Sequence, residues 1–185
     1  MDSYNKERLF TKEELIQTGF QYLDGIGISF ICNVCISNGG SCCKQCTELV
    51  DGEGCQQRNT SCTSWLCGFL KLLFFEVGLL EEWEQFWDQI PGRAFRTDYT
   101  PSIVEIQKEL EIPNIKYLGQ ALAKDVERIL NQNKHENINE LKYVLDLYVR
   151  FSLNGVQGKS EAELKELTSD FHSFKSALEI HKEDY

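Results

Sequence analysis

The chain has 185 residues, a formal net charge of −10 and 42% hydrophobic residues. This length holds one domain with a sizeable core, and the apolar content excludes an intrinsically disordered protein. The acidic balance, without a cluster of Lys and Arg to offset it, argues against direct binding to nucleic acid or to an anionic membrane.

The first predicted element is a helix that begins after Thr11. Thr11 and Glu14 have the spacing of a capping box, in which the side chain of each residue bonds the backbone amide of the other. Apolar residues follow at helical spacing, and the helix is predicted to end near Gly25 and Gly27. The short apolar run 26–31 then predicts a strand or an extended segment.

A cysteine-rich segment, 28–67, follows the first helix. The turn signals Gly39-Gly40 and 51–54 indicate that loops dominate it. It holds every cysteine of the chain, which are Cys32, Cys35, Cys42, Cys43, Cys46, Cys55, Cys62 and Cys67.

The rest of the chain predicts a helical bundle. A long apolar helix, capped by Thr60 or Ser61, is expected to carry Cys62 and to continue to Trp87 or Asp88, where Pro91-Gly92 ends it. Thr100-Pro101 is expected to open the next helix, because proline suits the first helical position. Pro113 should break that helix, and another should begin at Asn114.

Two further cap signals follow along the chain. Asn137 with Glu140 predicts one helix start, and Ser160 with Glu163 predicts another. The last helix is predicted to have a short heptad seam, made of Leu164, Leu167, Phe171, Phe174 and Leu178. A seam this short favours packing inside a bundle over a coiled-coil dimer.

These elements predict a mainly α fold: a helical bundle with a Cys-rich, loop-dominated metal-binding module near the N-terminus. We expect a single domain over residues 1–185, with the module at 28–67. The bundle, 62–185, shares the helix that begins at Cys62.

The dense cysteines indicate either a metal site or a disulfide framework. The polar segment 1–8 lacks the apolar run of a signal peptide, so we expect a cytoplasmic protein, in which thiols stay reduced. That compartment favours metal coordination. The histidines, His135, His172 and His181, all lie far from the cysteines, so the expected ligands are thiolates alone.

The spacing of the cysteines is compatible with two four-thiolate sites. Two C-x2-C pairs, Cys32 with Cys35 and Cys43 with Cys46, form one set, and Cys42, Cys55, Cys62 and Cys67 form the other. One four-cysteine site with the remaining cysteines structural, or one shared cluster, are the alternatives. Zn²⁺ is the expected metal and an iron–sulfur cluster is the alternative, because four thiolates suit both.

Residues 30 to 70 also resemble a known family. They place adjacent cysteines, a further cysteine, a Gly-Cys pair, an arginine and two closing cysteines in one order: Cys42, Cys43, Cys46, Gly54, Cys55, Arg58, Cys62 and Cys67. This order is similar to that of a bacterial cysteine-rich family described as a zinc- or iron-chelating domain, although members carry Arg-Pro where this chain has Arg58-Asn59. The resemblance implies metal binding. Some relatives methylate flagellin lysines with an iron–sulfur cluster, but no methyl-donor site is recognisable here.

No catalytic motif accompanies the cysteines, and we expect no catalytic residue. The loop residues Arg93, Arg96, Asp98 and Tyr99 suit a structural cap better than an anion site. The acidic run Glu76, Glu81, Glu82, Glu84 and Asp88 suits a solvated helix face.

The expected function is that of a bacterial interaction or regulatory protein, with a mainly structural metal and a protein partner. An iron–sulfur redox protein or enzyme, and an acidic mimic of nucleic acid that inhibits an enzyme, are the alternatives.

Overall fold

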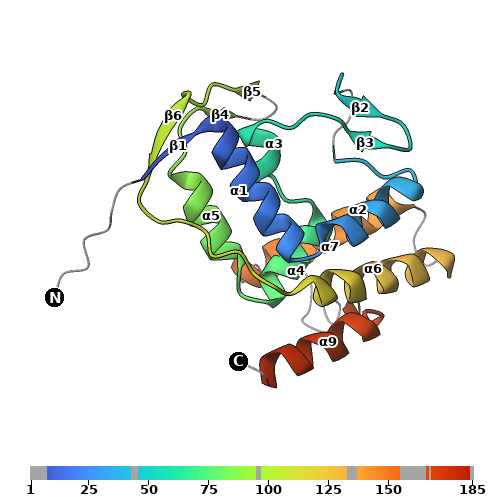
Figure 1. Ribbon diagram of the computed structural model, residues 1–185. Helices are drawn as coiled ribbons and strands as arrows, with labels where there is room; N and C mark the ends of the chain where they lie inside the picture. Colours follow the sequence, from blue (N-terminus) through green and yellow to red (C-terminus); the bar gives the residue numbers. More distant parts are fainter. Residues whose placement is uncertain are drawn as a thin grey trace.

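A computed structural model describes residues 8–42, 46–94, 97–132, 137–154, 166 and 168–183. The fold is mainly helical, as predicted (Figure 1). Its helices are α1 (Lys12–Gly25), α2 (Ile28–Ser37), α3 (Thr60–Ser64), α4 (Gly68–Glu76), α5 (Leu80–Asp88), α6 (Lys116–Asn131), α7 (Ile138–Asn154) and α9 (His172–Glu183). Its short strands are β1 (Arg8–Thr11), β2 (Leu49–Val50), β3 (Gly54–Cys55), β4 (Arg93–Ala94), β5 (Thr97–Asp98) and β6 (Ile103–Ile106). The strands pair antiparallel as β1–β6, β2–β3 and β4–β5.

The predicted capping box at the start of α1 is confirmed. The Thr11 amide donates to Glu14 Oε2 at 2.7 Å, and the Glu14 amide donates to Thr11 Oγ1 at 3.2 Å. Two of the orphan amides of the helix are thereby satisfied. The helix ends at Gly25, where the sequence predicted its end.

The apolar run after α1 forms a helix, so the prediction of an extended segment was wrong. Gly27, with φ of 82°, bends the chain and begins α2. Cys32 and Cys35 therefore lie one turn apart on a helix instead of in a loop. Within the described residues, no single helix is long and apolar enough to cross a membrane; only α1 and α2 together, bent by 85°, reach that length and composition.

The predicted long helix from Cys62 is broken into α3, α4 and α5. Trp65 and Cys67 have extended backbone, with ψ of 130° and 169°, and these two residues separate α3 from α4. Gly78, with φ of 74°, ends α4. Gly68 lies so close to α7 that a Cβ atom there would meet the carbonyl oxygen of Lys142. The break at Cys67 therefore lets α4 pack against α7 at close range.

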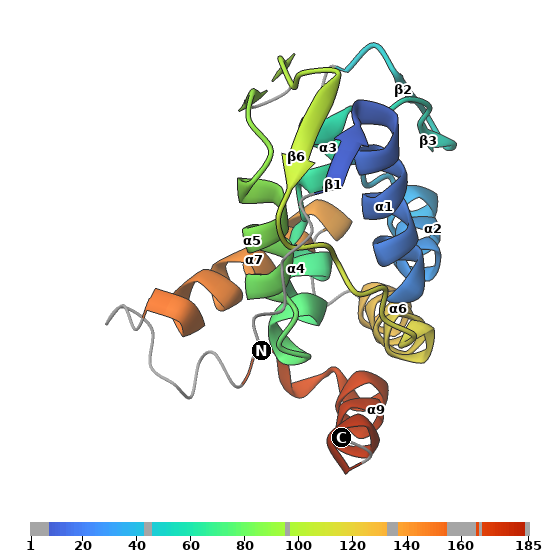
Figure 2. The ribbon, with the colours of Figure 1, turned by 60° about the vertical axis from the view of Figure 1, so that its left-hand side comes forward.

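The helix predicted after Pro101 is also absent, because residues 103–106 form strand β6. Alternate residues of β6, Val104 and Ile106, are buried, whereas Ile103 and Glu105 are exposed. This period of two is that of a half-buried strand. β6 pairs with β1, with Phe10 opposite Val104 (Figure 2). The helix predicted from Asn114 does form, as α6.

The core lies between α1, α4 and α5, where aromatic rings gather. The ring centroid of Trp83 lies 5.4 Å from those of Tyr22 and Phe74 and 5.5 Å from that of Trp87. All four side chains are almost fully buried. This cluster joins the N-terminal helix to the central pair of helices and gives the fold a rigid centre.

The C-terminal half adds α6, α7 and α9. Asn137 caps α7 as predicted, since its Oδ1 accepts from the amides of Asn139 and Glu140, both at 3.0 Å. α9 packs against α6 at the edge of the molecule (Figure 2). The predicted cap at Ser160 and Glu163, and the seam residues Leu164 and Leu167, lie outside the described residues. Phe171, Phe174 and Leu178 are buried.

Candidate metal centre

The turn after α2 brings Cys42 back towards the helix. The Gly40 amide donates to the Cys35 carbonyl at 2.8 Å, and Gly39 has φ of 73°. A Cβ atom on Gly40 would meet the sulfur of Cys35. The chain therefore reverses tightly over Cys35, and only a residue without a side chain fits at that point.

Cys67 approaches the same place from the other side. It is buried and is the N-cap residue of α4, with extended backbone. The amide of Leu70, in the first turn of the helix, favours its thiolate form. Burial has the larger, opposite effect and raises the pKa of the Cys67 thiol to about 12.

Cys32, Cys35, Cys42 and Cys67 form what we call the four-thiol cluster. The charge of each of these thiols influences that of the other three, so the four side chains lie in one neighbourhood. Burial is the main reason that the pKa of Cys32 is raised to about 12, and the nearby Cys42 thiol adds to the rise. Burial also raises the pKa of Cys35, and Cys42 adds to that rise. The raised pKa values keep Cys32, Cys35 and Cys67 protonated at neutral pH unless a metal ion replaces their protons.

Two cationic side chains face the four-thiol cluster. Arg58 lies near Cys32 and lowers its pKa, and Lys142 of α7 does the same for Cys35. Lys142 Nζ donates to the Ser41 carbonyl at 2.7 Å and to Asn139 Oδ1 at 2.9 Å. Within the part of the chain that the structure describes, neither cation forms an ion pair with a carboxylate.

Cys55 and Cys62 lie on elements other than those that carry the four-thiol cluster. Cys55 ends strand β3, and its Sγ donates to the Gln57 carbonyl at 2.9 Å. Cys62 lies in α3, where its amide donates to Asn59 Oδ1 at 2.8 Å. Cys46 is half-buried, and Cys43 lies outside the described residues.

The sequence-based pairing divides the four thiols of the cluster between two sites, with Cys32 and Cys35 in one and Cys42 and Cys67 in the other. In the structure the charges of all four influence one another, and the pairing stays a prediction because Cys43 lies outside the described residues. Among the described residues, no three His, Cys, Asp or Glu side chains are already placed as ligands of one metal ion. A formed metal module is thus not shown, and the thiols would have to move closer together around an ion.

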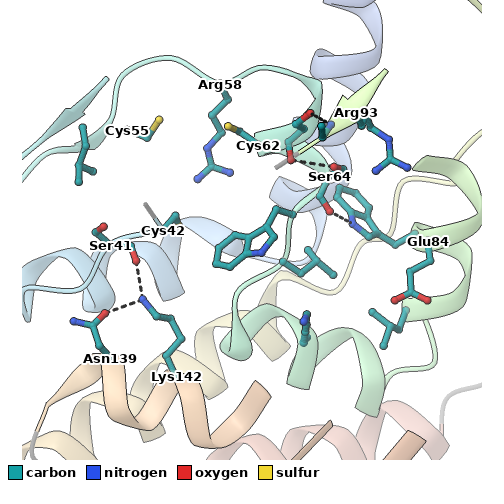
Figure 3. A pocket seen from close by; sticks show the side chains of 18 of the residues that line it. Ser41, Cys42, Cys55, Arg58, Cys62, Ser64, Glu84, Arg93, Asn139 and Lys142 are labelled. Carbon is teal, nitrogen blue, oxygen red and sulfur yellow. Dashed lines mark hydrogen bonds between the residues drawn. The ribbon is translucent and has the colours of Figure 1, made fainter. Parts of the chain in front are cut away.

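A cavity of about 940 Å³ opens beside the four-thiol cluster. Cys42, Cys55 and Cys62 line the cavity (Figure 3). Cys42 belongs to the four-thiol cluster, whereas Cys55 and Cys62 do not. Arg58 and Lys142 extend into it from opposite walls. The centre is therefore reachable from solvent on the side of Cys42.

The loop around Asp98 has the structural role that the sequence favoured. Asp98 accepts from the amides of Thr60 at 3.0 Å and Thr100 at 2.9 Å, and pairs with Lys12 Nζ at 3.0 Å. It thereby ties α3 and the start of α1 to strand β5. Tyr99 is 77% exposed, and Arg96 lies outside the described residues.

Sequence reasoning missed the role of Lys142. It lies 101 residues after Ser41 in the chain, and no local sequence pattern connects the two. Arg58 was noted only as part of a motif, and its approach to Cys32 follows from the path of the chain after β3. Long-range pairs of this kind require the tertiary fold.

Comparisons with protein-family models, with curated proteins and with solved structures find no match to this chain.

Proposed function

We propose that this chain binds a metal through Cys32, Cys35, Cys42 and Cys67, as a zinc ion or an iron–sulfur cluster. The observation that carries the proposal is that four thiols from three separate segments influence one another's charge, beside two cations that have no carboxylate partner within the described residues. Among those residues no three ligands are yet placed around one ion, so the thiols would have to close around the metal. Four thiolates are the ligand set of structural zinc and of iron–sulfur clusters.

The charges support this assignment. A zinc ion with four thiolates carries about two net negative charges, which are costly to bury without compensation. Arg58 and Lys142 supply two positive charges next to Cys32 and Cys35. Within the described residues, neither Arg58 nor Lys142 forms an ion pair with a carboxylate, although the chain has a net charge of −10. A thiolate-bound metal would supply the negative charge that these two cations lack.

The role of the metal would be mainly structural. It would fasten the turn through Cys42 and the C-terminal part of α2 to the start of α4. The protein would then act through interaction with, or regulation of, a protein partner. The sequence also predicts a second four-thiolate site. With Cys42 and Cys67 in the four-thiol cluster, that site would have to use the remaining cysteines, Cys43, Cys46, Cys55 and Cys62.

Elemental analysis of anaerobically purified protein tests the proposal. We expect about one zinc per chain, or iron and sulfide with a brown colour and visible absorption if a cluster is present. The Cys67→Ser and Cys32→Ser variants should lose the metal, because an incomplete shell binds far more weakly.

Cys55→Ser is the matched control. Because Cys55 lies outside the four-thiol cluster, this variant should keep the metal of that cluster, whether or not a second site that uses Cys55 is lost. Full metal content in Cys67→Ser protein would refute the ligand assignment. Natively folded, metal-free protein with all its thiols titratable would refute metal binding itself.

A further inference from the structure

The cavity beside the four-thiol cluster has a binding chemistry of its own. Its wall carries four cationic side chains and two acidic ones, which are Arg58, Lys71, Arg93, Lys142, Asp51 and Glu84. Its volume, about 940 Å³, suits a small organic molecule. Lys71 and Arg93 are paired with Asp146 and Asp88, so the positive charge available to a ligand in the cavity comes from Arg58 and Lys142.

Arg58 is the cation of the wall with unused donors. Lys71 is held 2.5 Å from Asp146 Oδ1, and Arg93 lies 3.3 Å from Asp88 Oδ1. Arg58, by contrast, is half-buried and makes no ion pair or hydrogen bond with any residue that the structure describes. Its guanidinium lies 5.7 Å from the centroid of the Phe20 ring and near Cys32. A guanidinium presents paired N–H groups that match a carboxylate, sulfonate or phosphate.

An aromatic surface lies in the same wall. Trp65 is 42% exposed and lines the cavity, although it is large and apolar. Its extended backbone, between α3 and α4, directs it away from the core, while Trp83 Nε1 donates to the Ser64 carbonyl at 2.9 Å and fixes the neighbouring chain. An exposed indole and a guanidinium that line the same cavity favour a planar ring that carries an anionic group.

We infer that this cavity binds a small organic anion with a planar ring, which stacks on Trp65 and accepts hydrogen bonds from Arg58. Lys142, on the opposite wall, adds positive charge (Figure 3). This inference goes beyond the proposed metal binding and does not require it. A metal at the four-thiol cluster would weaken the attraction of Arg58 for the anion but leave its N–H donors available.

Calorimetric titration of the purified protein with two matched probes tests the inference. Naphthalene-2-sulfonate carries the ring and the anionic group, and naphthalene-2-sulfonamide is its neutral counterpart. We expect one sulfonate site per chain, with at least about tenfold tighter binding than the sulfonamide. Arg58→Gln should remove that preference, whereas Trp65→Leu should weaken both probes by several-fold.

Arg8→Gln is the matched control, because Arg8 also stacks on a phenylalanine, Phe10 at 4.9 Å, but lies away from the cavity. It should leave both affinities unchanged. Equal binding of the two probes by the unmodified protein, or equal effects of Arg58→Gln and Arg8→Gln, would overturn the inference. If Arg58→Gln fails to fold, the probe comparison and Trp65→Leu still decide. The metal content of the same samples shows separately whether the proposed metal site is present.

Discussion

At the scale of single residues, Asp98 and Lys142 show how one charged side chain can join distant segments. The Asp98 side chain is 5% exposed and accepts hydrogen bonds from three segments of the chain. Burial alone would raise its pKa, but hydrogen bonds from Lys12, Thr100 and Thr60 outweigh it and hold the pKa of Asp98 well below its ordinary value. The ionised carboxylate is therefore the form that stabilises the fold.

Replacing Asp98 by Asn should destabilise the protein in a pH-dependent way. Near neutral pH we expect Asp98→Asn to lower the free energy of unfolding by about 2 kcal/mol, since the ion pair with Lys12 and one acceptor are lost. A lowered pKa stabilises the fold above the unfolded-state pKa, about 4, and this contribution is lost as the pH falls further. Denaturant unfolding at several pH values should show the gap between variant and parent closing in acid.

Asp88→Asn is the control for that measurement, because the Asp88 side chain pairs with Arg93 but is 80% exposed. It should change stability by less than about 0.5 kcal/mol. A gap for Asp98→Asn that is constant down to low pH would contradict the role assigned to the carboxylate.

Lys142 should affect metal binding although it is no ligand. Replacing it by Met removes a positive charge next to Cys35 and the bond to the Ser41 carbonyl. We expect the zinc affinity, measured by competition with a chelator, to fall about tenfold, as for other residues that support metal ligands. Lys116→Met, which removes an exposed pair with Asp24, is the control and should leave the zinc affinity unchanged.

At the scale of elements, the start of α9 depends on one buried carboxylate of α6. Asp125 is fully buried, and its Oδ2 accepts from the Phe174 amide at 2.8 Å. Asp125 Oδ1 also contacts Arg128, which donates to the Asp170 carbonyl. The carboxylate therefore supplies the acceptor that the first turn of α9 needs, and it does so from another helix.

Asp125→Ala should loosen α9 from α6. A buried amide and a partly buried guanidinium would lose their partner, so we expect a loss of about 2 to 4 kcal/mol in the free energy of unfolding. Asp24→Ala, which removes an exposed ion pair with Lys116, should cost less than about 1 kcal/mol. Chemical denaturation of both variants decides the matter, and equal losses would contradict the capping role of Asp125.

The same scale shows how far the sequence predicts this fold. The caps at Thr11 and Asn137 were predictable because their signals are local. The break at Cys67 was not, because it depends on the close approach of Gly68 to the backbone of α7. Strand β6 was not predicted, because Thr100-Pro101 has the signature of a helix start. The alternation of exposed and buried residues at 103–106 is the signal that decides for a strand.

The candidate site was predictable only as far as local sequence signals describe it. Clustered cysteines in the sequence indicated metal chemistry, but their grouping depends on the turn at Gly40 and on the placement of Cys67 by the broken helix. Helical spacing on α2 explains why Cys32 and Cys35 share a face. No spacing rule places Cys42 and Cys67 beside them.

At the scale of the whole molecule, the four-thiol cluster joins the N-terminal segments to the helical core. Cys67 begins α4, which packs against α7, and Lys142 of α7 reaches back to the turn at Ser41. The aromatic cluster around Trp83 and the packing of α6 with α9 involve no cysteine. The core should therefore persist without metal, whereas the cysteine-rich segment should depend on it.

Removing the metal should accordingly loosen residues 28–67 while most of the helical core persists. Amide hydrogen exchange before and after treatment with a strong chelator measures this directly. We expect fast exchange across 28–67, continued protection of α6 and α7, and a lowered melting temperature, because metal binding free energy contributes to folding. The start of α4 should show an intermediate effect, since Cys67 is both a proposed ligand and the N-cap residue of that helix. Loss of protection throughout α6, α7 and α9 would instead mean that the metal organises the entire fold.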